Sequence, residues 1–296
     1  MDEGHVIGLF DVAMDIVLVS VAAGAAFLGA PAGVSGAFLL LPFQLSVLGY
    51  TSPSVSATNL VYNVVATPAG IYRYLKEGRF LWPVVYATAP AAALGVALGA
   101  YVRAHLLYDP AAFKLFVGLV LLWLGARVLI SAVGPGEATR KAERREGAEG
   151  RPAMEVKIIK FGFPRVEYEF LGAVYAFSVP AMSAAAFAIG VVSGVYGIGG
   201  GSILSPVMAS VFKLPLHTTA GACMLNTLIT SAFGIASYYA VGAPPNWPLG
   251  LILGAGGIAG TYLGARLQKH LPERVIRLVL SALVLAIALT YLASPS

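Results

Sequence analysis

Charged residues are scarce in this chain. Asp, Glu, Lys and Arg make up 11% of its 296 residues, while 58% are hydrophobic. Soluble domains carry about 25% charged residues. The mean hydropathy of +0.81 points the same way. This composition excludes a soluble protein and predicts one that lies in a lipid bilayer.

Cysteine is nearly absent as well. Cys223 is the only one, so the chain can form neither an intramolecular disulfide nor a thiolate metal cluster. The zinc-protease pattern His-Glu-x-x-His does not occur either. We therefore expect no metal centre and no cofactor.

Apolar runs long enough to cross a bilayer recur along the chain. The first is predicted to remain as a helix, because residues 1–5 lack the cationic region of a cleaved signal peptide. A span needs roughly 20 apolar residues, and eight stretches approach this length: 12–30, 54–75, 81–102, 113–133, 171–193, 217–241, 247–268 and 274–293. Two shorter runs, 34–48 and 199–213, either cross or turn back.

Each short run begins at a glycine-rich motif. Residues 33–42 read GVSGAFLLLP and residues 197–206 read GIGGGSILSP. Glycine and proline interrupt a helix, and free backbone groups at membrane depth are tolerated only where protein or a water-filled cavity satisfies them. Two matched breaks in two halves predict a transport site.

The two halves are an internal duplication. At an offset of 164, glycines, a proline and a tyrosine coincide: Gly33, Gly36, Pro42, Gly70 and Tyr74 fall on Gly197, Gly200, Pro206, Gly234 and Tyr238. At an offset of 165, Trp82, Pro83, Gly95 and Gly99 fall on Trp247, Pro248, Gly260 and Gly264. We predict a first membrane repeat at 1–133, a basic linker at 134–170 and a second repeat at 171–296. The paired Gly-x-x-x-Gly motifs predict close helix packing.

The positive charges indicate on which side of the membrane each loop lies. Loop 73–79 carries three cations, whereas its counterpart, 242–246, carries none. The linker is basic, and a further cluster precedes the last span. Because cytoplasmic loops are enriched in Lys and Arg, we predict inverted repeats in the cell membrane, with both termini outside and the linker cytoplasmic. The net charge of +5 then reflects orientation rather than a nucleic-acid partner.

The predicted fold is an all-α integral membrane protein. Each inverted repeat comprises a glycine-broken helix pair and three transmembrane helices. In the linker, residues 137–152 have the composition of a solvated loop. Residues 156–161 and 166–170 flank a Gly-Phe-Pro-Arg turn, a strand-turn-strand pattern that predicts a small cytoplasmic β-hairpin.

A helix that begins inside the membrane presents free N–H groups and about half a positive charge. In an inverted repeat the two breaks meet near the midplane, and together they predict an anion site. Asn59 and Asn226 are the leading side-chain ligands, because an amide in hydrocarbon needs partners. The predicted substrate-binding residues are Gly33, Ser35, Gly36, Thr58, Asn59, Asn63, Gly197, Gly199, Gly200, Gly201, Ser202, Cys223 and Asn226. The alternative is that these polar side chains only join helices to one another.

Acids and bases are missing from both glycine motifs and from the polar stretches 56–63 and 218–227. This argues against a carboxylate site for cations and against a proton relay. An anion channel is one alternative to a carrier. An intramembrane protease is another, because Gly33-Val34-Ser35-Gly36 matches the motif around the nucleophile of rhomboid-type enzymes. A serine nucleophile needs a base, however, and every histidine lies at or near the end of a segment.

The motif, the repeat and the basic linker resemble the TauE/SafE family of sulfite and organosulfonate exporters. The resemblance covers residues 17–292, and its most specific element is the segment 194–206. The first copy departs from the family motif at Ser35 and Ala37, and the family's second polar stretch stands here as residues 57–59 and 221–223. The resemblance implies a multipass transporter of small anions such as sulfite or sulfonates, including sulfoacetate. In such a carrier, one repeat is expected to rock against the other.

Overall fold

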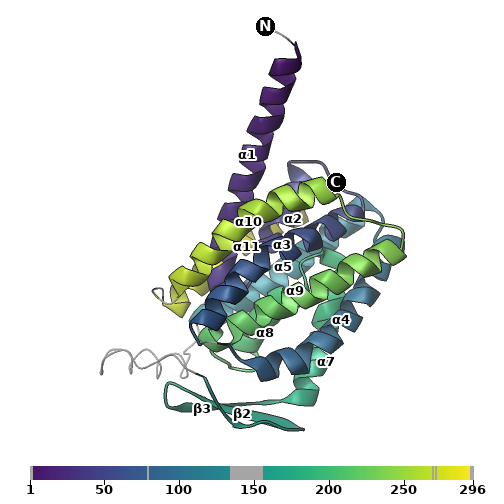
Figure 1. Cartoon of the computed structure of the whole chain (residues 1–296). Coiled ribbons are helices and arrows are strands. Elements are labelled where there is room, and N and C mark those ends of the chain that lie inside the picture. The colour runs from purple at the N-terminus through teal and green to yellow at the C-terminus, as the bar shows by residue number, and fades with distance from the viewer. Residues whose placement is uncertain (1–2, 79, 134–155, 269, 271, 294–296) are drawn as a thin grey trace.

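The structure is a computed structural model that describes residues 3–78, 80–133, 156–268, 270 and 272–293. Helices dominate it (Figure 1). The first half contains α1 (Glu3–Gly29), the short 3-10 helix η1 (Ala30–Ala32), α2 (Ala37–Ser46), α3 (Ser54–Lys76), α4 (Trp82–His105) and α5 (Pro110–Val133). The strands β1 (Lys157–Lys160), β2 (Arg165–Phe170) and β3 (Ala173–Ser178) follow. The second half contains α7 (Val179–Tyr196), α8 (Gly200–Ser210), α9 (Leu216–Ala240), α10 (Trp247–Gln268) and α11 (Glu273–Ala293).

Six helical segments in the described ranges are long and apolar enough to cross a membrane. They are Ala13–Ala32, Trp82–His105, Pro110–Ile130, Val179–Tyr196, Leu216–Ala240 and Trp247–Gln268. The sequence predicted eight. The helix α3 falls short in hydropathy because it carries buried polar side chains and two cations in its last turn, and it packs against α9 and α10. The apolar part of α11 is the shorter segment Leu278–Ala293.

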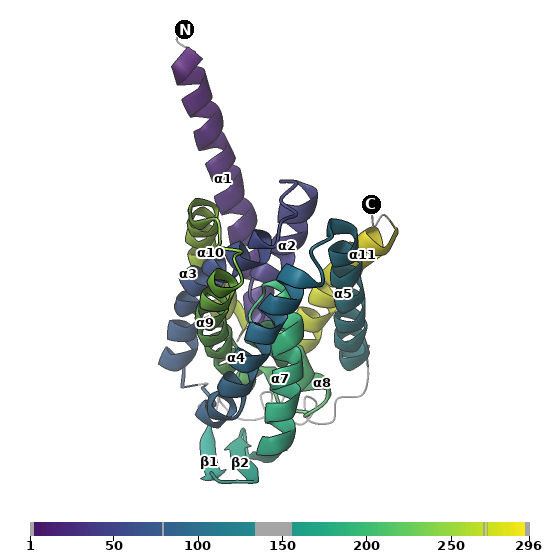
Figure 2. The same ribbon diagram turned by 90° about the vertical axis from the view of Figure 1, so that its right-hand side faces the viewer.

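The helices α2 and α8 are too short to cross a bilayer alone. They have 10 and 11 residues, which correspond to about 15 Å each, roughly half of a hydrocarbon core. The helix α7 leaves the sheet at Val179, whose N–H bonds to Pro164 O (2.9 Å). The start of α9 is back at the sheet, where Tyr168 and Thr218 share a hydrogen bond (3.1 Å). The pair α7/α8 therefore enters and returns on one side, while α2 lies toward the opposite end of the bundle (Figure 2).

The first helix of each half packs against the third long helix of the other half. A Cβ on Gly95 or Gly99 of α4 would overlap the carbonyl oxygen of Phe187 or Val191 on α7. On α10, a Cβ on Gly260 would overlap Ala23 O of α1, and one on Gly264 would lie 2.6 Å from Phe27 O. Only glycine permits this backbone approach, so the close packing predicted from the Gly-x-x-x-Gly motifs is confirmed.

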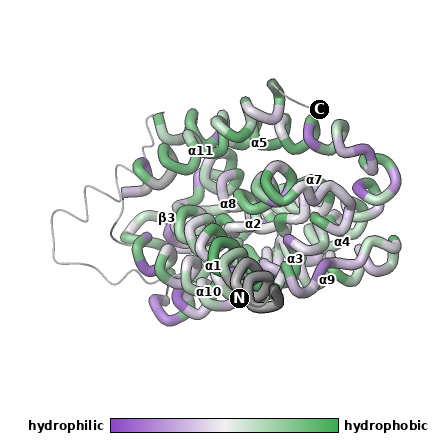
Figure 3. The backbone as a smooth tube through the Cα atoms, turned by 90° about the horizontal axis from the view of Figure 1, so that it is seen from above, coloured by the Kyte–Doolittle hydropathy of each residue, from purple (hydrophilic) through white to green (hydrophobic). Residues whose placement is uncertain are grey.

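The equivalent helices α3 and α9 cross in opposite directions. Moving forward along α3, Asn63 bonds to Ser231, and Gly70 then approaches Met224, which lies earlier in α9. The helices α5 and α11 also pair in opposite directions: Gly118 meets Leu292 and Gly125 meets Leu285. Seen from above (Figure 3), α5 and α11 form one edge of the bundle, while apolar residues cover most helix turns.

The predicted hairpin is present and is extended by a third strand. The antiparallel sheet has the order β1-β2-β3. Leu171 and Gly172 connect β2 to β3 and both have positive φ values, 50° and 69°, as in the tight turns that suit hairpins. The prediction that a span begins at 171 was therefore wrong, because α7 begins at Val179. Residues 137–152, predicted as a solvated loop, lie outside the described residues.

Candidate functional site

The first break ends its helix with a left-handed glycine. Gly33 has a φ of 68°, and its N–H donates to Ala30 O (2.9 Å) while the next amide, Val34 N–H, donates to Gly29 O (3.1 Å). This pair of bonds caps the free carbonyls at a helix end. The chain then turns, and α2 begins at Ala37, with the Ala37 N–H donating to Ser35 Oγ (3.1 Å).

The second break uses the same device. Gly197 has a φ of 86°, and Ile198 N–H donates to Ser193 O (3.2 Å), the counterpart of the bond at Gly29. A second left-handed residue follows, since Gly199 has a φ of 73°. The helix α8 begins at Gly200, whose N–H donates to Thr230 Oγ1 on α9 (2.8 Å).

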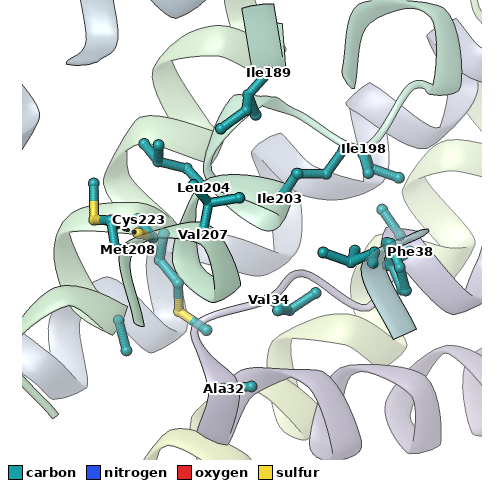
Figure 4. Packing of buried hydrophobic residues seen from close by; sticks show 14 of the residues in the cluster. Ala32, Val34, Phe38, Ile189, Ile198, Ile203, Leu204, Val207, Met208 and Cys223 are labelled. Atoms are coloured by element: carbon teal, nitrogen blue, oxygen red, sulfur yellow. Dashed lines mark hydrogen bonds between the residues drawn. The ribbon is translucent and has the colours of Figure 1, made fainter. Parts of the chain in front are cut away.

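The two breaks touch each other. The N–H of Ser35 donates to Ser202 Oγ (3.3 Å), and Ser205 Oγ donates to Ala32 O. In the close-up (Figure 4), Val34 and Phe38 of the first break lie close to Ile198 and Ile203 of the second. Segments more than 160 residues apart in the chain therefore form one centre.

A buried polar network joins the breaks to the helices behind them. Ser35 Oγ donates to Asn63 Oδ1 on α3, and Asn63 Nδ2 donates to Ser231 Oγ on α9 (3.1 Å). Ser35 is 4% exposed, and Asn63 and Ser231 are 0% exposed. No side chain in this network carries a charge, so its electrostatic character comes from amides, hydroxyls and the ends of helices.

Several amides at the breaks have no bonded acceptor among the described residues: those of Gly36, Gly199 and Gly201. They belong to the first turns of α2 and α8, where N–H groups have no partner within the helix. Two helix N-termini thus bring partial positive charge to one place. Free donors beside neutral side chains are the elements of an anion site.

Other predicted ligands lie outside this network. Asn59 donates to Ala37 O (2.8 Å) and accepts from Gln44 (2.9 Å), so it joins α3 to α2. Thr58 bonds to Ser54 O and Asn246 N–H, and Cys223 contacts Met208 Sδ (3.7 Å). For these three, the structure shows the helix-joining bonds that the sequence left as the alternative. Asn226 is buried beside Thr88 on α4, and its Nδ2 donates to Thr88 Oγ1 (3.3 Å).

The sequence analysis did not name four buried polar residues of this region. They are Thr88, Ser205, Thr230 and Ser231. A signal was available for two of them, because Thr230 and Ser231 follow Asn226 and Thr227 at a spacing of four and share their helix face. Ser205 lies on α8 one turn after Ser202.

The breaks are packed closed in this structure. Their hydroxyls bond to one another and to neighbouring backbone, as described above. A small pocket beside them is apolar and lies between α5, α11 and the two breaks. It is lined by Val34, Phe38, Leu124, Gly125, Val128, Pro206, Leu280, Ser281 and Val284. The polar centre is therefore closed to solutes in this structure.

Sequence comparison assigns this architecture to a family. The model of the sulfite exporter TauE/SafE family matches residues 16–291. The chain belongs to this family. TauE/SafE proteins are transporters and not enzymes, so Ser35 is not the nucleophile of a protease. Its hydroxyl bonds to Asn63 and to the Ala37 amide.

Similar proteins have names that agree with this assignment. A probable membrane transporter protein of Xylella fastidiosa (strain Temecula1) is 25% identical over 262 residues, 86% of this chain and 87% of that protein. YunE of Bacillus subtilis, a probable membrane transporter protein, is 22% identical and covers 82% of this chain and 77% of YunE. MamO of Paramagnetospirillum magneticum, also a probable membrane transporter protein, is 26% identical over 99% of this chain, which spans 47% of MamO. This chain thus covers about half of MamO's length. No solved structure matches it.

Proposed function

We propose that this TauE/SafE protein is a carrier of small anions, namely sulfite and sulfonates, and that it binds them between its two glycine breaks. The supporting observation is the contact between the breaks, Ser35 N–H to Ser202 Oγ, at the place where the N-termini of α2 and α8 meet. The family is described as sulfite exporters, which supports an anion as the substrate.

Neutral donors suit a carried anion. Each helix N-terminus contributes roughly half an elementary charge, so two of them attract an anion without a permanent cation. A buried Lys or Arg would hold the anion more tightly and slow its release. The substrate ligands we propose are the substrate-binding residues predicted from the sequence, with the network around Ser35, Asn63 and Ser202 at its centre and Gly36, Gly199 and Gly201 as backbone donors.

Inverted repeats account for the packing. The equivalent helices α3 and α9 run in opposite directions, and so do α5 and α11. A repeat from 1 to 133 and one from 171 to 296, joined by the linker 134–170, would produce this arrangement. The cations Lys157 and Lys160 lie on the sheet, and Arg73 and Lys76 end α3. The positive-inside rule would make the sheet end cytoplasmic and both termini external.

The units that move are then two mixed bundles and not the two sequence halves. One bundle contains α1, α2, α3 and α10, and the other contains α4, α7, α8 and α9, because these sets pack within themselves. The tight contacts of Gly95 with Phe187 and of Gly260 with Ala23 bind each half's first helix to the other half. Rocking at the α3–α9 crossing would open the breaks to alternate sides.

Spin-label distances distinguish these two movements. Tyr101 (α4) and Ala181 (α7) belong to one bundle but different halves, whereas Tyr101 and Tyr72 (α3) belong to one half but different bundles; all three are exposed. On a Cys223→Ala background, sulfite is expected to change the Tyr101–Tyr72 distance and to leave Tyr101–Ala181 unchanged. The opposite result would instead support a movement in which each sequence half rocks as one intact unit.

A flux assay tests the site. Ser202→Ala removes the hydroxyl that joins the breaks, and we expect sulfite flux in proteoliposomes to fall about tenfold, because one buried hydrogen bond of this kind contributes roughly 1 kcal/mol and its unpaired partner adds more. Ser237→Ala is a matched control: Ser202 Oγ donates to Ile198 O and Ser237 Oγ to Phe233 O, both four residues back, but the bond of Ser237 lies at the surface, away from the breaks. Equal flux in the two variants would refute the site, and flux that does not saturate with sulfite would indicate a channel.

A further inference from the structure

The Asn226 amide is only half satisfied. Asn226 is 0% exposed, and its Nδ2 donates to Thr88 Oγ1 (3.3 Å). Its Oδ1 has no hydrogen-bond partner in the described part of the chain. Buried polar atoms almost always have partners, so an unpaired one indicates a role or a missing ligand.

Thr88 decides which end of this amide is left free. The hydroxyl hydrogen of Thr88 goes to Val84 O (2.7 Å), and a hydroxyl has only one hydrogen to donate. Thr88 Oγ1 can therefore only accept from Asn226. Rotating the amide by 180° would place two acceptors opposite each other, so the nitrogen faces Thr88 and the free end is the oxygen.

The Asn226–Thr88 pair lies close to the second break. Asn226 precedes Thr230 by one turn on α9, and Thr230 Oγ1 accepts from Gly200 N–H (2.8 Å). Thr88 precedes Ala92 by one turn on α4, and a Cβ on Gly200 would lie 3.0 Å from Ala92 Cβ. The Asn226–Thr88 pair is thus about one helical turn, roughly 5 Å, from the start of α8.

The backbone N–H groups of the second break and the side-chain oxygen of Asn226 require different hydrogen-bonding groups on a ligand. The amides of Gly199 and Gly201 are donors and need an acceptor such as a sulfonate or sulfite oxygen. Asn226 Oδ1 is an acceptor and needs an O–H or N–H. A fully deprotonated anion without a donor group satisfies the first requirement and is repelled by the second.

We propose that the transported anion carries a hydrogen-bond donor, which Asn226 Oδ1 accepts while the break amides bind the negative group. The ligand class is hydroxy- or amino-substituted sulfonates and singly protonated oxyanions. Thr88 is a positioning residue that keeps the amide oxygen turned to the ligand. This inference rests on the proposed anion site at the breaks.

A matched pair of sulfonates tests the inference. Isethionate (2-hydroxyethanesulfonate) differs from ethanesulfonate by one hydroxyl and has the same charge. Calorimetry on the purified full-length protein is expected to show isethionate binding about tenfold more tightly. The preference is expected because the hydroxyl alone can donate to the buried oxygen.

Two variants test whether the preference for isethionate arises at the Asn226–Thr88 pair. Thr88→Val removes the group that holds the amide, so Asn226 can turn its nitrogen toward either ligand, and the isethionate preference is expected to fall below threefold while both sulfonates still bind. Asn226→Leu is expected to abolish the preference. Thr290→Val is the control, because Thr290 is exposed on α11 and bonds only within its helix, and it is expected to keep the tenfold preference.

The possible failures are distinguishable. If wild-type protein binds both sulfonates equally, the donor requirement is refuted while the anion site stands. An unchanged preference in Thr88→Val would refute the positioning role. If neither sulfonate nor sulfite binds to wild-type protein, the proposed function itself fails, and this inference fails with it.

Discussion

The two glycine breaks have the same cap but obtain their hydroxyls differently. In the first, Ser35 supplies a hydroxyl from within the break, and this hydroxyl bonds to Asn63. In the second, Gly199 stands at the position equivalent to Ser35, and the hydroxyl that bonds to the same Asn63 comes from Ser231 on α9. A Cβ on Gly199 would lie 2.7 Å from Ser231 Oγ. The two breaks thus contribute unlike residues to one centre. The same substitution at equivalent positions of the two breaks is therefore expected to have different effects.

The largest expected effect comes from giving the second break the residue of the first. Ala37 and Gly201 are equivalent, but a Cβ on Gly201 would overlap Cys223 O. Gly201→Ala is expected to destabilise the protein by about 3 kcal/mol, at the upper end of overpacking costs, and to abolish transport. Thermal unfolding in detergent measures this.

A control for that substitution exists in the same chain. A Cβ on Gly24 meets nothing within 4 Å, and alanine is favoured over glycine in a helix. Gly24→Ala is therefore expected to leave the melting temperature unchanged or raised. If Gly201→Ala were equally harmless, α8 and α9 would not cross as closely as described.

An intermediate effect is expected from making the first break resemble the second. Ser35→Gly removes the hydroxyl that bonds to Asn63 and caps the Ala37 amide, without adding bulk. We expect sulfite flux in proteoliposomes to fall about tenfold, consistent with about 1.4 kcal/mol, while the protein folds. Flux at the wild-type level would mean that the second break binds the anion alone.

The smallest effect is expected at the cap of α8. Thr230→Ser keeps the hydroxyl that accepts from Gly200 N–H but loses the methyl group. Sulfite flux in Thr230→Ser should stay within about twofold of wild type. In Thr230→Val, which lacks the acceptor, sulfite flux should fall several-fold. Equal flux in Thr230→Ser and Thr230→Val would show that the cap is unimportant.

Much of the fold was predictable because the signals are local. The spans predicted at 81–102 and 247–268 correspond to α4 and α10, and the turn around Pro164 does connect two strands. The third strand was missed because Val174–Phe177 is apolar and runs directly into the next span, so hydropathy does not separate them. The four-residue spacing on α9 could have revealed Thr230 and Ser231. The comparison of halves conceals Thr230, because Ala66 occupies its position in the first half.

The site was predictable only in part. The contact of the breaks follows from the duplication, and the structure places Asn63, one of the predicted ligands, beside the first break. Asn59 lies one turn earlier on α3 and faces α2, and nothing local in the sequence says which face of α3 turns toward α9. Thr88 lies on a helix that shares no motif with the breaks, so only tertiary packing brings it to Asn226.

The exchange of first helices also constrains how the protein is made. The helix α1 leaves the ribosome long before its tight partner α10, whose Gly256, Gly260 and Gly264 lie against the α1 backbone. The helix α1 must therefore wait in the lipid with its small-residue face uncovered until α10 has been inserted. By contrast, α7 finds α4 already in place. Biogenesis of the two halves is thus unequal although their final packing is nearly the same.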